Sequence, residues 1–101
     1  QAERRKRELE VVGIPNARRA IDVHLAQCKA EQDALQARKH PASNVWGTPS
    51  KDEARASAQR EAALGQEMVA AARNCATRTQ VLTSELETLR RECSAIGCVP
   101  Q

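Results

Sequence analysis

The chain has 101 residues, of which 29% are charged and only one, Trp46, is aromatic. A chain of this length forms one domain, and without the buried area that aromatic side chains supply it cannot fill a thick globular core. The net charge of +3 is too small to require a nucleic-acid partner, and no apolar run approaches the ~18 residues of a membrane span. The composition favours a thin core in which helices touch along an aliphatic seam.

Residues 1–12 are good helix formers and predict a first helix. Gly13-Ile14-Pro15 follow, where Gly and Pro favour a break or a kink. A basic run in this helix is expected on a solvated face or close to anionic lipid head groups. It comprises Arg4, Arg5, Lys6 and Arg7.

Residues 16–39 predict a second helix with Asn16 as its N-cap. One face of this helix is apolar and holds Ile21, Leu25, Cys28 and Leu35. His40-Pro41 ends it, because the residue before a proline is pushed out of the helical region. Residues 40–50 are rich in Pro, Ser, Gly and Asn and predict a loop. We expect Trp46 of this loop to pack on the alanines that follow, or, if exposed, to contact a partner.

Residues 51–96 predict one long helix, followed by a tail at 97–101. Ser50 and Glu53 form a capping-box pattern at its start. Its apolar positions alternate in steps of four and three, which is the heptad pattern of coiled-coil packing. These positions are Met68, Ala72, Cys75, Thr79, Leu82, Leu86, Leu89, Cys93 and Ile96.

Five pairs of seam residues share one sum of residue numbers, as antiparallel helices require. The pairs are Cys28/Cys75, Ile21/Leu82, Leu35/Met68, Ala17/Leu86 and Ile14/Leu89. The register that brings two cysteines together therefore also stacks the apolar residues. The sequence predicts an all-α fold, an antiparallel helical hairpin or coiled coil with one long C-terminal helix, stapled by disulfides.

The four cysteines allow more than one interpretation. We expect a Cys28–Cys75 disulfide from the register, and a Cys93–Cys98 disulfide because Gly97 suits a helix C-cap between them. In the alternatives all four are reduced seam residues of a cytosolic coiled coil, or one seam cysteine links two copies. Disulfides indicate a periplasmic or secreted location, and any targeting or anchoring segment would lie outside this chain.

Motifs for metal binding or catalysis are weak. His24 and Cys28 lie one turn apart, and Cys75 would come opposite, but no fourth zinc ligand is apparent, so neither a metal nor another cofactor is expected. The sequence has no Gly-rich phosphate loop, GxSxG or HExxH motif, and a thin helical hairpin lacks the concave pocket of an active site. The chain is predicted not to be an enzyme.

The stretch Met68–Leu89, with Asn74-Cys75-Ala76-Thr77-Arg78 followed by leucine heptads, resembles the C-terminal part of inner-membrane spanins, which are phage lysis proteins. That resemblance implies a charged, alanine-rich periplasmic coiled coil that pairs with an outer-membrane lipoprotein. No catalytic residue carries over from it.

Two functions of different classes follow from these patterns. The first is an extracytoplasmic structural or interaction protein, membrane-tethered or oligomeric, whose long helix exposes a second apolar stripe to a protein partner. The candidate residues of that stripe are Val69, Ala76 and Val81. The second is a small soluble disulfide-stapled module, such as an inhibitor, immunity or antagonist protein, that binds through the loop around Trp46.

Overall fold

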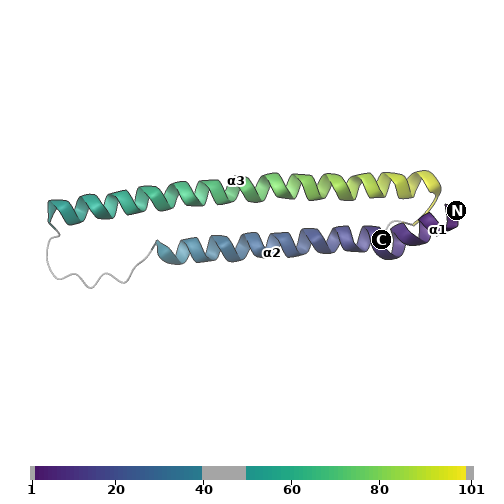
Figure 1. Cartoon of the computed structure of the whole chain (residues 1–101), viewed down its shortest axis with the longest axis horizontal. Coiled ribbons are helices and arrows are strands. Elements are labelled where there is room, and N and C mark those ends of the chain that lie inside the picture. The colour runs from purple at the N-terminus through teal and green to yellow at the C-terminus, as the bar shows by residue number, and fades with distance from the viewer. Residues whose placement is uncertain (1, 40–49, 100–101) are drawn as a thin grey trace. The chain divides into compact units, whose positions relative to one another are not determined.

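The structure, a computed structural model, describes residues 2–39 and 50–99. Its helical elements are named in chain order in Figure 1 and comprise α1 (Ala2–Glu8), the π-helical turn η1 (Leu9–Gly13), α2 (Ile14–Arg38) and α3 (Lys51–Ile96). No residue in the described ranges lies in a β-strand. Trp46 and the rest of the predicted loop up to residue 49 lie outside these ranges.

The chain divides into two compact units, each with one stretch from either side of the hairpin. The terminal unit joins Gln1–Ala26 with Cys75–Gln101, and the turn unit is Gln27–Asn74. In the terminal unit, Arg5 of α1 pairs with Glu92 of α3. In the turn unit, Arg38 Nη2 lies 3.1 Å from Glu67 Oε2.

In both pairs a low residue number on the first side of the hairpin goes with a high one on α3, and the sum of the two numbers stays nearly constant. The helices are therefore antiparallel in each unit. The terminal unit also brings two of the predicted seam pairs, Ile14/Leu89 and Ala17/Leu86, into one apolar cluster. The predicted all-α antiparallel hairpin with a long C-terminal helix is confirmed.

The prediction for Gly13-Ile14-Pro15 is a break or a kink. The helix does not break there, because it passes through the π-helical turn η1 and continues as α2. The Ile14 N–H donates to the carbonyl of Leu9, five residues earlier. Inside an α-helix the proline ring would clash with the carbonyl four residues back, and the wider π turn directly before Pro15 accommodates it. Asn16 consequently lies inside α2 rather than at an N-cap, and its Oδ1 accepts a hydrogen bond from Arg19 at 3.5 Å.

Both predicted ends of α3 are confirmed. The Ser50 Oγ accepts from the Glu53 N–H at 3.1 Å, and the Ser50 N–H donates to the Glu53 carboxylate at 3.3 Å, which is the capping box. At the other end Gly97 has a φ of +80°, and the Cys98 N–H donates to the Cys93 carbonyl at 2.9 Å. This left-handed glycine turns the chain back over the last helical turn.

The apolar core is concentrated in the terminal unit, where one cluster joins α3 to η1 and the start of α2. Its buried members are Leu9, Ile14, Leu86, Cys93 and Cys98, and Ala17, Ile21, Leu89 and Ile96 pack against them. The turn unit buries Leu64 and Ala71. The buried α3 residues of the terminal cluster, Leu86 and Cys93, are predicted seam positions, whereas Leu64 and Ala71 are not.

Two predicted seam positions are wrong by one residue. Ala71 is buried and Ala72 is exposed. The seam residue after Met68 is therefore three positions further along the chain, and not four as predicted. Leu25 is 46% exposed, because His24, one residue earlier, faces α3 in its place. Steps of three and four are both compatible with the 3.6-residue period of a helix, so packing decides between neighbours.

Candidate functional site

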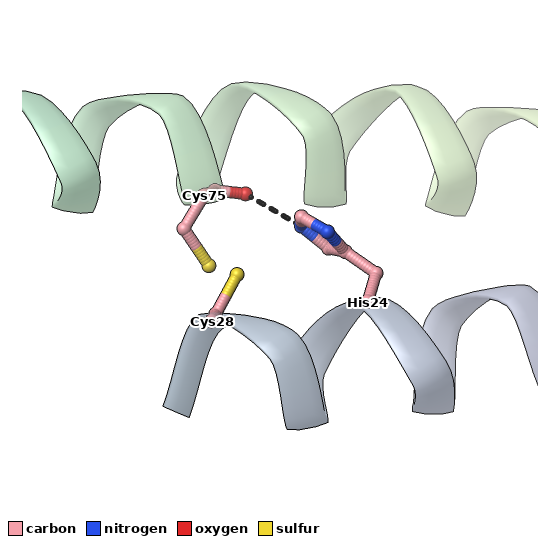
Figure 2. A group of neighbouring side chains, drawn as sticks. All are labelled: His24, Cys28 and Cys75. Atoms are coloured by element: carbon pink, nitrogen blue, oxygen red, sulfur yellow. Dashed lines mark hydrogen bonds between the residues drawn. The ribbon is translucent and has the colours of Figure 1, made fainter. Parts of the chain in front are cut away.

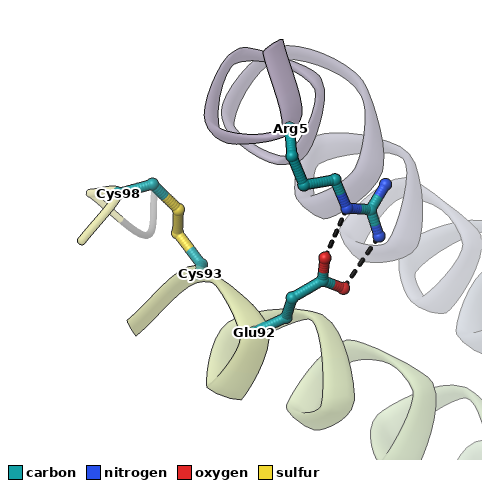
Figure 3. Close-up of a disulfide and its surroundings, with 4 residues drawn as sticks. All are labelled: Arg5, Glu92, Cys93 and Cys98. Carbon is teal, nitrogen blue, oxygen red and sulfur yellow. Dashed lines mark hydrogen bonds and ion pairs between the residues drawn. A yellow bond between two sulfur atoms is a disulfide. The ribbon is translucent and has the colours of Figure 1, made fainter. Parts of the chain in front are cut away.

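The end of α3 is fastened by a disulfide between Cys93 and Cys98, whose Cα atoms are 5.0 Å apart (Figure 3). Cys93 is fully buried and Cys98 is 7% exposed, and both belong to the apolar cluster of the terminal unit. The predicted C-terminal bridge is therefore confirmed. It holds the residues after α3 against the cluster.

An ion pair beside this disulfide joins α1 to α3. The Arg5 guanidinium donates to both carboxylate oxygens of Glu92, through Nε and, at 2.8 Å, through Nη2 (Figure 3). It also donates to Glu8 at 2.8 Å. The hydrogen bond from Arg5 lowers the pKa of Glu92, and the same bond raises the pKa of Arg5. Both side chains stay more than a third exposed, so water and salt screen the pair.

Cys28 and Cys75 are also disulfide-bonded, and no described cysteine is free. The prediction that all four cysteines are disulfide-bonded is therefore confirmed. Within the terminal unit, His24 Nε2 lies 3.1 Å from the carbonyl oxygen of Cys75 (Figure 2). The Thr79 hydroxyl donates to the same carbonyl at 2.7 Å, so this oxygen of α3 contacts two polar side chains.

The described residues contain one group of metal-ligating types, His24, Cys28 and Cys75. Zinc is bound by thiolate sulfur, whereas both of these sulfurs are held in disulfides. In this oxidised form the cysteines act as structural crosslinks. His24 positions its ring against the α3 backbone rather than completing a ligand set.

The predicted partner-binding residues of α3 are solvent-exposed. Val69 is 51% and Val81 is 42% exposed, and Ala76 is exposed as well. Val69 and Ala76 are seven residues apart, which places them on one face two turns apart. Val81 lies on a different face of α3, so these residues make two patches rather than one straight stripe. The other predicted contact, Trp46, lies outside the described residues.

The basic run of α1 separates into two pairs of residues with different roles. Arg5 binds Glu92 and Glu8, and Lys6 lies 3.6 Å from a Glu3 carboxylate oxygen. Arg4 and Arg7 are exposed and make no ion pair within the described ranges. The sequence prediction treated the four as one run, although the helical period itself turns neighbouring residues to different sides.

Three exposed valines were not predicted as surface features. Val11 and Val12 of η1 are 65% and 49% exposed, and Val99 is 67% exposed. Val11 and Val12 belong to η1, so their exposure depends on the path of that turn. A π turn has no simple sequence signal, so the helical pattern alone could not have placed them.

Neither α2 nor α3, nor any other helix in the described part, combines the length and apolarity needed to cross a membrane. No family model matches the chain, and no curated protein or solved structure matches it either. The functional argument therefore depends on the geometry of the molecule alone.

Proposed function

We propose that the protein is a non-enzymatic helical interaction protein of an extracytoplasmic compartment, in which α3 presents apolar surface to a protein partner. The observation that carries this proposal is the exposure of Val69 and Val81 on a helix whose inner seam is already occupied. Large apolar side chains left in water on a rigid helix are available to pack against a further helix.

The disulfides support the extracytoplasmic part of the proposal. Disulfides persist in oxidising environments and are rare where thiols are kept reduced. A hairpin with a small core gains stability from such crosslinks. The periplasmic part of a membrane-tethered assembly, such as a phage spanin, is the specific role that we propose within this class.

The partner that we test first is a second copy of the chain, because it needs no unidentified component. Light scattering after size-exclusion chromatography should show assemblies larger than a monomer that become more abundant with concentration. The double variant Val69→Ser, Val81→Ser should shift the protein to the monomer. Val23→Ser is the matched control, because Val23 is 50% exposed on α2, and it should leave the assembly unchanged.

Two results would contradict this proposal. One is a wild-type protein that is monomeric at every concentration, and the other is an equal loss of assembly in the Val23 control. A monomer whose binding to a partner is abolished by Trp46→Ala would instead favour the soluble binding module. Circular dichroism of each variant tests whether the helices remain formed.

A further inference from the structure

We propose that the outer surface of α1 and η1 is a docking site for anionic lipid head groups, formed by Arg4, Arg7 and Val11. This site adds a lipid contact to the protein–protein role proposed above. The two surfaces share no residue, so either proposal can fail without the other.

The first step of the argument is the pairing of charges in the terminal unit. Four of its carboxylates are held in ion pairs with Arg5, Lys6 or Arg90: Glu3, Glu8, Glu87 and Glu92. The arginines that make no ion pair within the described ranges are Arg4, Arg7, Arg18, Arg19, Arg78 and Arg91. The carboxylates of this unit that make no ion pair within the described ranges are Glu10, Asp22 and Glu85. The unpaired arginines outnumber them, so the unpaired charge of the unit is predominantly basic.

The second step is the position of the two arginines in α1. Residues 4, 7 and 11 follow the i, i+3, i+7 spacing of one helical face. Arg4, Arg7 and Val11 line one shallow hollow of α1 and η1, together with Glu3, Lys6 and Glu10. Glu3 is ion-paired with Lys6, so Glu10 is the one lining carboxylate that no described cation pairs with.

The third step is the apolar component. Val11 is 65% exposed directly beside these arginines, and Val12 is 49% exposed next to it. Helices that lie at a membrane surface combine basic side chains, which contact phosphates, with apolar side chains that enter the acyl boundary. The buried Leu9 anchors the same turn to the apolar cluster, so the valines are presented by a fixed backbone.

A lipid surface fits this patch better than an acidic protein does. The patch spans only about two helical turns from Arg4 to Val11, and all of its residues come from the single stretch formed by α1 and η1. A stable protein interface buries about 800 Å² on each partner with matched shapes. A bilayer supplies dense negative charge and requires no shape complementarity, and each basic residue near it adds to the attraction.

The test is co-sedimentation of the whole chain with vesicles of phosphatidylcholine alone or of phosphatidylcholine with phosphatidylglycerol. The wild-type protein should bind only the anionic vesicles, and added salt should weaken binding. We expect Arg4→Gln, Arg7→Gln to lower the partition coefficient roughly tenfold or more. Val11→Ser should lower it less, because the charges remain.

The matched control is Arg55→Gln, Arg60→Gln, which removes the same charge from two exposed arginines of α3 in the turn unit. This variant should bind like wild type. The proposal is overturned if the control loses as much binding as the α1 variant, if the α1 variant binds like wild type, or if anionic vesicles are not bound at all. Arginine-dependent capture of polyglutamate without vesicle binding would also overturn it, in favour of an acidic polypeptide partner.

Discussion

The two units of the hairpin are built from the same kinds of helix but are held together very differently. The terminal unit buries Leu9, Ile14, Leu82, Leu86, Cys93 and Cys98, whereas the turn unit buries only Leu64 and Ala71 among the described residues. The terminal unit also holds the Cys93–Cys98 disulfide. Apolar burial is the dominant stabilising term, so the terminal unit is expected to carry most of the stability.

The turn unit depends more on local interactions. Its ion pairs, Lys29–Asp33 and Arg38–Glu67, lie between side chains that are at least half exposed, and such pairs contribute little. Ser50 caps the start of α3. Local opening draws on the least buried parts of a structure, and we therefore expect hydrogen exchange to be faster in the turn unit.

The largest expected effect comes from the apolar cluster. Leu86→Ala should lower the free energy of unfolding by roughly 2–5 kcal/mol, because it removes buried methyl groups and leaves a cavity. Leu25→Ala is the matched control on α2. Leu25 is 46% exposed, so its loss should change stability by only about 0.5 kcal/mol. Urea unfolding followed by circular dichroism measures both, and equal effects would contradict the location of the core.

The second effect concerns the C-terminal bridge. Replacing both cysteines, Cys93→Ser and Cys98→Ser, should lower the free energy of unfolding by roughly 2 kcal/mol, because a short crosslinked loop regains its freedom in the unfolded chain. Two buried apolar sulfurs also become hydroxyls. Hydrogen exchange should accelerate at the end of α3 before it accelerates in α2. Ser94→Ala, at an exposed position in the same turn, should have no comparable effect.

Much of the helical architecture could be predicted from the sequence. The heptad pattern of α3, its capping box and Gly97 predicted both ends of the helix, because each is a local rule about backbone groups. The shared register predicted the antiparallel pairing, because the apolar side chains can stack in only one alignment. The expected bridge between Cys93 and Cys98 depends on the turn that Gly97 makes at the end of α3.

The errors arise where local sequence rules do not distinguish between two neighbouring residues or between two backbone conformations. Pro15 predicted a break or a kink, but the chain continues through a π turn, and Leu9 and Ile14 are both buried in one cluster. Ala71 and Ala72 are chemically identical, so only the fit against the second helix selects one of them. Arg5 and Arg4 are also identical in type, and only the approach of Glu92 gives Arg5 a structural role. These outcomes depend on tertiary contacts that no single segment contains.

A third prediction tests the turn unit. Ser50→Ala should remove about 1 kcal/mol of local helix stability, because the Glu53 N–H loses its acceptor. The amides of the first turn of α3 should exchange faster, while unfolding of the terminal unit should stay unchanged. Ser57→Ala, an exposed change within α3, is the control. A cap variant that destabilised the terminal unit as strongly would show that the two units do not open separately.

The smallest effect is expected from the ion pair of the terminal unit. The hydrogen bond from Arg5 lowers the pKa of Glu92, so the stabilising contribution of the pair is present above the pKa of an unfolded glutamate. It is lost as the pH falls through the lowered pKa of the folded protein. Glu92→Gln should therefore be less stable than wild type at neutral pH, and the difference should shrink on acidification.

Glu31→Gln is the control for this change, because Glu31 is exposed on α2 and makes no ion pair in the described part of the chain. Its stability difference from wild type should be close to zero at every pH. If Glu92→Gln and Glu31→Gln gave the same pH profile, the pair would be fully screened. The stability of the terminal unit would then come from apolar burial and the disulfide alone. In that case the buried Leu9, rather than the ion pair, would hold this end of the chain against α3.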